Sequence, residues 1–382
     1  ALGERRGVLC GPAGTGKTTL LCTLLADLRA DGWGIRLLAP TGRAAARARE
    51  VTGEDTQTVH SAIFERVTNG ENGKPLFHDP KAPCVGRAAV FVDEASMVSR
   101  WLDGHLQAQI PREAALFYVG DREQLPPVED VWGPDFDRPT ATLTVVHRQA
   151  LDNPIVAIAT SVRCGGKLPP GEQGDAYVRR TGSIGGLAEE VAEARLRGEN
   201  VAVLTYRNAI RQNVNRLVRR ALGRTAPLEP GDRLLVRANS RAIGRMNGEV
   251  LDVEEVTGWP ESRGWATDVE RGALRVRTAC GARFWVHPDL FGAKRERFWE
   301  VIGWPKGPGP GLRGTSPEEW LHVDWGESLT VHTSQGSEFD RVFFVIDGFM
   351  KQFLAKDPVF ARRLTYTAVT RARRRLDVLD VG

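Results

Sequence analysis

Residues 11–18 read GPAGTGKT, two glycines separated by four residues and followed by lysine and threonine. This spacing is typical of a phosphate-binding loop. Glycines let the backbone turn so that successive N–H groups point inward and cradle phosphate oxygens. The ammonium of Lys17 can reach the β- and γ-phosphates of a nucleoside triphosphate, and the hydroxyl of Thr18 can ligate Mg²⁺. We predict that the residues binding the nucleotide are Gly11, Pro12, Ala13, Gly14, Thr15, Gly16, Lys17, Thr18 and Thr19.

An acidic pair follows a short apolar run further along the chain. Residues 88–92 read AAVFV, which is typical of a buried strand, and Asp93 and Glu94 come directly after them. Ligands of open α/β sheets bind at the carboxyl ends of the strands. We therefore expect Asp93 to hold Mg²⁺ and Glu94 to orient and deprotonate the attacking water. The pair is weak evidence by itself, but together with Lys17 and Thr18 it indicates hydrolysis of a nucleoside triphosphate.

Two further polar side chains follow apolar runs that we expect to be strands. Gln124 comes soon after residues 115–119, and its amide could sense the γ-phosphate. Arg148 comes soon after residues 143–146 and could stabilise negative charge on the phosphates, with a structural salt bridge as the ordinary alternative. Both residues are therefore candidates for catalysis.

The surrounding pattern predicts the elements that position these residues. Residues 8–10 are expected to form a buried strand, and leucines at helical spacing in 20–28 follow on one face of a helix. That helix would point its positive N-terminus at the phosphates. A second strand is expected at 35–39, and Thr41 can cap the next helix, whose free N–H groups could hold a phosphate of a polymer. His60 opens another short helix and would by itself most often be a packing or surface residue.

Two segments interrupt this α/β pattern. Residues 62–86 contain two Asn-Gly pairs and several prolines, which predicts either a small hairpin or a disordered surface loop, because the alternation of the flanking residues is poor. Residues 228–323 contain strand-like alternation, a Gly/Pro-rich run and six of the ten tryptophans. We favour packing inside a small β-barrel for these tryptophans, and stacking on nucleic-acid bases is the alternative for exposed ones.

A second α/β unit lies on both sides of the longer interruption and contains no second phosphate loop. Its expected strands are 201–204, 329–332, 342–346 and 376–381, with a helix at 360–369. We therefore divide the chain into a first domain at 1–150 with a small insertion at 62–86, a second domain at 151–227 and 324–382, and a larger insertion at 228–323.

Composition limits the class of protein. A chain of 382 residues is too long for one ordinary core, so two or more domains are expected. Five scattered cysteines without a Cys-x-x-Cys pair argue against disulfides and zinc and suit a reducing cytoplasm. Neither an apolar run of about 18 residues nor a signal peptide is visible, so we expect a cytoplasmic protein outside the membrane. Arginines gather at 207–220 and 362–375, as solvated helix faces or as a phosphate-tracking surface.

Short motifs recur in a fixed order along the chain: GPAGTGKT at 11–18, APTGRAA at 39–45, TVHS at 58–61, DEAS at 93–96, GDREQLPPV at 120–128, HRQ at 147–149, MNGE at 246–249, TVHTSQGSEFD at 330–340 and YTAVTRAR at 366–373. Together they resemble the motifs of superfamily 1 DNA helicases of the RecD-like type, in the branch that moves 5′ to 3′. The resemblance runs through nearly the whole chain. The later motifs are more specific than the phosphate loop, because few other NTPases combine them.

This resemblance implies an α/β fold with two RecA-like P-loop NTPase domains, each built on a parallel sheet. It also implies ATP and Mg²⁺ in the cleft between the domains. The insertion at 228–323 occupies the place of the family's small β-rich, SH3-like barrel. The insertion at 62–86 occupies the place of its duplex-splitting pin.

The resemblance also implies roles for single residues. Gln124 matches the γ-phosphate sensor, and Arg148 and Arg371 match two arginine fingers contributed by the second domain or its junction. Gly336 and Glu338 fall in a motif expected to contact the nucleotide. The groove that grips phosphates of the strand without reading sequence is expected to contain Thr41, Arg43, His60, Asn247, His332, Thr333 and Ser334.

The activity implied is that of an ATP-dependent DNA helicase that moves 5′ to 3′ on single-stranded DNA and separates duplex. We expect a monomer that binds single strands and junctions between single and double strands, with recombination or replication proteins as further partners. One alternative is a nucleic-acid-binding subunit of a recombination or repair complex that uses ATP only as a switch. Another is a helicase that acts on RNA, because contacts to phosphate do not distinguish RNA from DNA.

Overall fold

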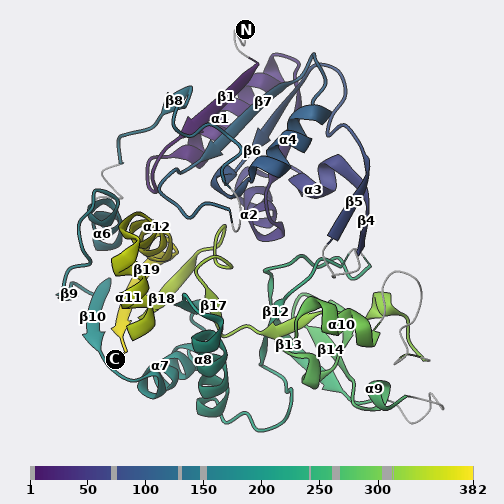
Figure 1. Cartoon of the computed structure of the whole chain (residues 1–382), viewed down its shortest axis with the longest axis vertical. Helices are drawn as coiled ribbons and strands as arrows, with labels where there is room; N and C mark the ends of the chain where they lie inside the picture. Colours follow the sequence, from purple (N-terminus) through teal and green to yellow (C-terminus); the bar gives the residue numbers. More distant parts are fainter. Residues whose placement is uncertain are drawn as a thin grey trace.

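The computed structural model describes residues 5–69, 75–127, 131–146, 153–240, 242–259, 267–302, 312 and 314–381. These residues form two α/β units and a third, antiparallel unit (Figure 1). In the view of Figure 1 the first unit lies above the other two, and the C-terminus lies in the second unit. The chain has the predicted α/β class, with two separate sheets of mainly parallel strands.

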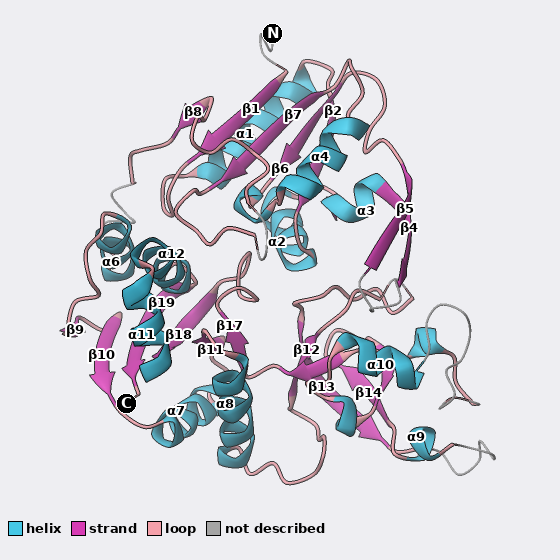
Figure 2. Cartoon of the chain, in the orientation of Figure 1, coloured by secondary structure: helices cyan, strands magenta, loops and turns pink. Residues whose placement is uncertain are grey.

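The first unit is built on a sheet in which all neighbouring strands are parallel, in the order β3-β2-β6-β7-β1-β8. Its strands are β1 (Arg6–Cys10), β2 (Gly34–Ala39), β3 (Thr56–Thr58), β6 (Ala88–Val92), β7 (Ala115–Gly120) and β8 (Ala141–Thr142). Successive residues of a strand point to opposite faces, so both faces of this sheet carry apolar side chains. Helices lie over both faces (Figure 2). One face is covered by α1 (Lys17–Ala30) and α2 (Gly42–Thr52), and the other by α3 (Val59–Ile63) and α4 (Arg100–Gln109).

The second unit has the strand order β17-β11-β18-β19-β10-β9, parallel except for the edge strand β9. Its strands are β9 (Gly171–Gln173), β10 (Tyr177–Thr181), β11 (Val201–Thr205), β17 (Ser328–Thr330), β18 (Phe339–Ile346) and β19 (Ala372–Asp380). One face packs on α6 (Pro154–Arg163), α11 (Gly348–Lys356) and α12 (Pro358–Val369), and the other on α7 (Ile184–Leu196) and α8 (Asn208–Ala221).

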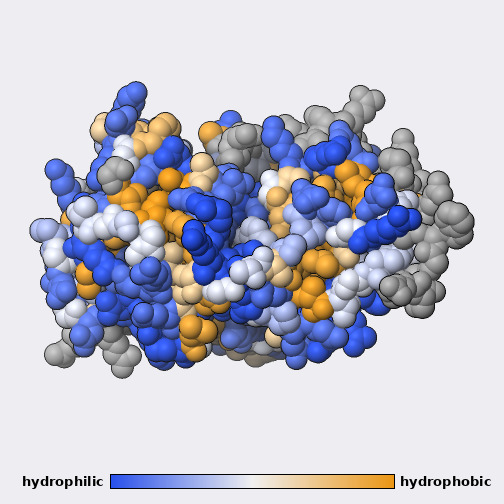
Figure 3. Space-filling model, turned by 90° about the horizontal axis from the view of Figure 1, so that it is seen from below, coloured by the Kyte–Doolittle hydropathy of each residue, from blue (hydrophilic) through white to orange (hydrophobic). Residues whose placement is uncertain are grey.

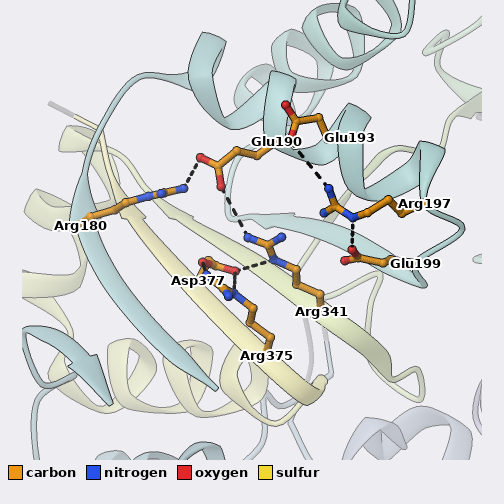
Figure 4. A network of polar contacts seen from close by, with 8 residues as sticks. All are labelled: Arg180, Glu190, Glu193, Arg197, Glu199, Arg341, Arg375 and Asp377. Carbon is orange, nitrogen blue, oxygen red and sulfur yellow. Dashed lines mark hydrogen bonds and ion pairs between the residues drawn. The ribbon is translucent and has the colours of Figure 1, made fainter. Parts of the chain in front are cut away.

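A network of arginines and carboxylates joins β18, β19 and α7 of the second unit (Figure 4). Asp377 of β19 is buried and accepts hydrogen bonds from Nε of Arg341 at 2.7 Å and from Nε of Arg375 at 3.0 Å. Arg341 also pairs with Glu190 of α7 at 3.5 Å. This carboxylate therefore has cationic partners within its own unit.

The third unit is an antiparallel sheet in the order β15-β14-β13-β12-β16. Its strands are β12 (Arg233–Val236), β13 (Val250–Thr257), β14 (Leu274–Thr278), β15 (Arg283–Val286) and β16 (Val323–Trp325), accompanied by α9 (Asp268–Arg271) and α10 (Arg295–Ile302). Trp285 and Trp320 are buried and pack with Trp259 and Trp299, as core packing requires. Trp265 and Trp304 lie outside the described residues. The SH3-like barrel and the domain boundaries stay predictions.

Two ion pairs with buried carboxylates join α8 of the second unit to the third unit. Arg211 pairs with Asp324 of β16, and both side chains are buried. Arg219 pairs with Asp232 at 2.9 Å, next to β12. These two arginines of the 207–220 run therefore belong neither to a solvated face nor to a phosphate-tracking surface, because an internal carboxylate neutralises each of them.

The segment at 62–86 contains two paired strands rather than only a loop. Strand β4 (Phe64–Asn69) and strand β5 (Pro75–Pro80) are antiparallel, with Phe64 opposite Pro80 and Asn69 opposite Pro75. Aromatic rings of Phe64, Phe77 and Trp101 pack together at the base of this hairpin. The packing compensates for the poor alternation along the strands.

The prediction of a strand at 143–146 is wrong. The edge strand β8 is formed by Ala141 and Thr142, which pair in parallel with Leu9 and Cys10 of β1. The pairing ends one residue later, where the N–H of Leu143 donates to the carbonyl of Cys10 at 2.8 Å. Register with β1, rather than apolar character, sets the position of this short strand.

The surface seen in Figure 3 is largely hydrophilic, with separate patches of hydrophobic residues. Within the part of the chain that the structure describes, no helix is both long enough and apolar enough to span a membrane.

Candidate nucleotide and strand-binding sites

The predicted phosphate loop connects β1 to α1 and has the backbone that the motif requires. Gly14 and Gly16 have φ values of 80° and 78°, which L side chains rarely adopt. A Cβ atom on Gly11 would lie 2.8 Å from Oγ1 of Thr15. The ammonium of Lys17 donates to the carbonyls of Gly11 at 2.7 Å and Pro12 at 3.0 Å, so it is held over the loop. The loop can therefore surround a phosphate with N–H groups and one cation.

The acidic pair lies at the carboxyl end of β6, next to the phosphate loop. Burial, with the like charge of Glu94 as the second cause, raises the pKa of Asp93 to about 6, and Lys17 partly offsets this. Glu94 has a φ of 51° and donates its N–H to Oδ1 of Asp93 at 2.9 Å. A left-handed non-glycine residue costs on the order of 1–3 kcal/mol, so the rest of the fold holds Glu94 in this position.

The residues predicted to hold Mg²⁺ fit that ion. A carboxylate from Asp93 and a hydroxyl from Thr18 are the oxygen ligands that Mg²⁺ prefers, together with phosphate oxygens. Asp93 is buried, and the like charge of Glu94 lies beside it. A divalent cation would supply the missing positive charge.

The segment after β7 holds the predicted sensor Gln124 and a residue that we did not predict. Gln124 is buried, and its Oε1 has no hydrogen-bond partner among the described residues. Asp121 is also buried; burial raises the pKa of its carboxyl, and the charge of Lys17 is the first influence that lowers it. Asp121 therefore lies near the phosphate loop. Its signal in the sequence is the one used for Asp93, a polar residue soon after a buried strand.

Arg371, a predicted arginine finger, is buried just after the C-cap of α12 in the second unit. Its guanidinium donates to the carbonyl of Thr367 at 3.1 Å, to the carbonyl of Ser337 at 3.2 Å and to Oγ1 of Thr370 at 3.0 Å. These bonds fix the side chain within its own unit. The other predicted finger, Arg148, lies outside the described residues.

Helix α12 brings other side chains to the first unit. The hydroxyl of Tyr366 contacts the phosphate loop, and Oγ1 of Thr367 accepts the N–H of Leu125 at 3.0 Å. Arg362 pairs with Glu123 at 3.2 Å. The cleft between the two α/β units is therefore closed at the sensor segment by hydrogen bonds and an ion pair.

The two residues from the TVHTSQGSEFD motif that we predicted at the nucleotide lie where the units meet. Gly336 has a φ of 73°, and a Cβ atom there would lie 2.9 Å from Cβ of Ala44 in α2. Glu338 accepts bonds from Arg47 of the first unit and Arg373 of the second. Burial raises the pKa of Glu338, but the arginines outweigh it and leave the pKa below its ordinary value.

Residues predicted to grip the strand fall into separate groups. Thr41 caps α2 by accepting the N–H of Ala44, and Arg43 donates to the carbonyl of Gly248 at 3.1 Å, so Arg43 lies beside the exposed Asn247. Burial lowers the pKa of Arg43 to about 10, which leaves it charged at neutral pH. A cavity of about 520 Å³ between the three units brings Arg43 together with Gly336 and Glu338.

His60 lies in the aromatic cluster at the base of the hairpin. Its ring stacks on Phe77 at 4.8 Å and on Trp101 at 6.2 Å between centroids. Burial, with His105 as the second cause, lowers the pKa of His60 to about 4. The imidazole is therefore neutral at pH 7 and could bind a phosphate only through an N–H group.

The last group follows β17 in the second unit. Thr333 and Thr330 share a hydrogen bond of 2.8 Å between their hydroxyls, and burial lowers the pKa of His332. The side chain of Ser334 is buried and donates to the carbonyl of Val331 at 2.8 Å. Thr333 and His332 thus remain partly exposed, whereas Ser334 holds the local turn.

Comparisons with known proteins match this arrangement. Residues 1–130 match the family described as AAA domain, and residues 326–379 match the UvrD-like helicase C-terminal domain. The ATP-dependent RecD2 DNA helicase of Deinococcus radiodurans is 32% identical over 98% of this chain and 46% of its own length. The ATP-dependent DNA helicase dda of phage T4 is 36% identical over 41% of this chain and 37% of its own length. The chain thus spans less than half of these two relatives.

A further relative and two solved structures match over nearly the whole chain. The RecBCD enzyme subunit RecD of Mycolicibacterium smegmatis is 28% identical over 99% of this chain and 69% of its own length. A Bacteroides Pif1 helicase, solved with ADP-AlF3 and single-stranded DNA, has a TM-score of 0.54 at 14% identity, over 98% of this chain and 88% of that one. The Pif1 helicase of Candida albicans has a TM-score of 0.53 at 18% identity, over 98% and 90%. These two likenesses concern the fold.

Proposed function

Because this chain belongs to the RecD-like superfamily 1 helicases, we propose that it is an ATP-driven motor that moves 5′ to 3′ on single-stranded DNA and separates duplex DNA. One observation carries the proposal. Two side chains of α12 in the second unit, Tyr366 and Thr367, bond to the phosphate loop and to Leu125 of the first unit, and so close the cleft beside the loop. A site completed by two units can convert a change in its occupancy into movement of one unit against the other.

Each part of the site has a task in hydrolysis. The N–H groups of the loop and Lys17 bind phosphates, and Thr18 and Asp93 hold Mg²⁺. Glu94, at the carboxyl end of β6, accepts the proton of the attacking water. When bound, ATP would supply the phosphoanhydride bond, and Mg²⁺ would offset the negative charge of Asp93 and of the phosphates. Gln124, whose Oε1 has no partner among the described residues, is placed to respond to the γ-phosphate.

The DNA strand would be gripped by both units. Arg43 and Asn247 offer a cation and an exposed amide at one side of the cleft, and Thr333 offers a hydroxyl from the second unit. Such groups hold phosphates without reading the bases. The hairpin of β4 and β5 projects from the first unit and is supported by aromatic packing, as an element that separates strands must be.

The test is unwinding of one duplex with a 5′ single-stranded tail, a 3′ tail or blunt ends, with ATP and Mg²⁺. We expect displacement from the 5′-tailed duplex only, and none with Lys17→Ala. Displacement from the 3′ tail alone would contradict the direction. A chain without DNA-stimulated hydrolysis would contradict the motor.

A second function has a specific observation in its favour. The RecD relative, which this chain covers over 69% of its length, is by name a subunit of a larger enzyme. An ATP-switched subunit would hydrolyse ATP when DNA is present but displace no strand from any of the three duplexes. Repeating the experiment with an RNA tail on the same duplexes distinguishes a motor that moves on DNA from one that moves on RNA.

A further inference from the structure

A tyrosine of the second unit is buried against the nucleotide site of the first. Tyr366 lies in α12, and its side chain is 1% exposed. Its hydroxyl donates to Oδ2 of Asp121 at 2.6 Å and accepts the N–H of Ala13 at 2.9 Å. Ala13 belongs to the phosphate loop, and Asp121 comes directly after β7. One hydroxyl therefore joins two separate parts of the nucleotide site from across the cleft.

The two bonds need a group that donates and accepts at once. A tyrosine hydroxyl does both, whereas a phenylalanine ring in the same place would leave the partly buried N–H of Ala13 and a buried carboxylate oxygen of Asp121 without that partner. The other carboxylate oxygen of Asp121, Oδ1, accepts the N–H of Glu123 at 3.0 Å. The hydroxyl thus completes the shell of a carboxylate that lies within the influence of Lys17.

Neighbouring bonds hold the same segment at its other end. The N–H of Leu125 donates to Oγ1 of Thr367 at 3.0 Å, and its carbonyl accepts from Nε2 of Gln335 at 3.1 Å. The second unit therefore contacts Asp121 and Leu125, which lie on either side of the predicted sensor Gln124. The position of Gln124 depends on both units.

We propose that Tyr366 is a positioning residue of ATP hydrolysis, whose hydroxyl fixes the phosphate loop relative to the Asp121–Leu125 segment only while the cleft is closed. The inference rests on the proposed function, because it concerns the same site. Separation of the two units breaks both bonds of the hydroxyl together. Closure of the cleft on DNA is thereby coupled to the rate of hydrolysis rather than to the affinity for nucleotide.

The experiment compares Tyr366→Phe with Tyr177→Phe in DNA-stimulated ATP hydrolysis. Tyr177 is a matched control, because it is also buried in the second unit and donates its hydroxyl to the carbonyl of Pro169 at 2.8 Å. We expect Tyr366→Phe to lower kcat at least tenfold with KM within threefold, and Tyr177→Phe to keep kcat within twofold. Equal losses in both variants, or a normal kcat in Tyr366→Phe, would overturn the proposal.

A double-mutant cycle tests the partner. If the hydroxyl acts through Asp121, then Asp121→Asn combined with Tyr366→Phe loses no more activity than the worse single variant. Multiplied losses would overturn the shared role. Should Tyr366→Phe fail to fold, Thr367→Val replaces it with the same expected fall in kcat, and a normal kcat there counts against the proposal.

The two hypotheses fail differently. A wild-type chain with no DNA-stimulated hydrolysis would refute the proposed function, and with it the positioning role of Tyr366. If the wild-type chain hydrolyses ATP with DNA stimulation and Tyr366→Phe is equally active, only the positioning role of Tyr366 is refuted.

Discussion

The two α/β units share an architecture but differ in how far the protein itself compensates the polar residues of the candidate site. In the first unit, Asp93 has a raised pKa beside Glu94, and Glu94 has a left-handed backbone. In the second unit, Arg371 donates to three oxygens and Tyr366 makes two hydrogen bonds. Asp93 thus carries charge that a ligand would compensate, whereas Arg371 and Tyr366 satisfy their polar groups through protein contacts. We therefore expect the first unit to bind the phosphates and the metal ion, and the second unit to provide the surface that closes on them.

The largest effect should come from Lys17→Ala, which removes the cation of the first unit. We expect DNA-stimulated hydrolysis to fall to background, because the loop amides alone cannot neutralise the β- and γ-phosphates. The fold should survive, as judged by circular dichroism and Tm. Lys356→Ala, at an exposed lysine of α11, is the control and should keep the wild-type rate. Substantial hydrolysis by Lys17→Ala would contradict the expectation that the first unit supplies the cation that binds the phosphates.

The second unit is tested by Arg371→Lys, which keeps the charge but loses the planar fork. Turnover should fall by about 10³-fold, the effect expected when an arginine finger is lost. Arg374→Lys is the control in the following strand, because the side chain of Arg374 is 83% exposed. If both variants hydrolyse ATP at similar rates, Arg371 only supports the backbone that it contacts.

A smaller effect is expected where the units touch without polar contacts. Gly336→Ala adds a Cβ atom 2.9 Å from Cβ of Ala44, whereas Gly281→Ala has the same kind of backbone (φ 83°) and open space. Both variants carry left-handed strain of about 1–2 kcal/mol. Only Gly336→Ala should also lower DNA-stimulated kcat, by about tenfold, and Ala44→Gly should restore part of it. Equal kcat values in the two variants would show that the contact does not matter for closure.

The smallest effect is in stability and should differ in sign between the units. The folded pKa of Asp93, about 6, exceeds its ordinary 3.8, so the ionised carboxylate destabilises the fold at pH 7.5, and stability is regained as the pH falls from about 6 towards 3.8. Without nucleotide and in EDTA, Asp93→Asn should raise the free energy of unfolding by about 1–3 kcal/mol. Asp377→Asn removes a partner of Arg341 and Arg375 and should lower it by about 1–3 kcal/mol.

Urea unfolding of both variants at pH 7.5 checks this difference. Two changes of the same sign would mean that the carboxylates of the two units are equally well compensated. Asp93→Asn should also be inactive, since it removes a predicted ligand of Mg²⁺.

Local patterns were sufficient for the parts of the site that lie within one unit. The strand at Ala88–Val92 and the loop at 11–18 are each encoded by consecutive residues, so the sequence alone predicts them. The bridge between Tyr366 and Asp121 joins residues 245 positions apart. Its formation depends on which face of α12 turns to the cleft, and periodicity within α12 cannot decide that. The misplaced edge strand has a similar cause, because its register is set by β1.

Composition and strand-like alternation predict the insertion at 228–323, but they do not predict the ion pairs that attach it to α8. Arg211 and Arg219 could be identified as part of a basic helix, yet their carboxylate partners lie beyond the helix, in the third unit or next to it. A charge run shows only that cations are present. The identity of the partner follows from the packing of α8 against the third unit.

The ion pairs of α8 make the contact between the second and third units firmer than the contact between the third unit and the first. Arg211 with Asp324 and Arg219 with Asp232 would leave buried, uncompensated charges if they parted, so the third unit travels with α8. Among the described residues, its contacts with α2 include the bond from Arg43 to the carbonyl of Gly248 and the close approach of Met246 to Gly42, which can separate at lower cost. The third unit is therefore held more firmly by the second unit than by the first, and any rotation of the second unit would carry the third unit with it.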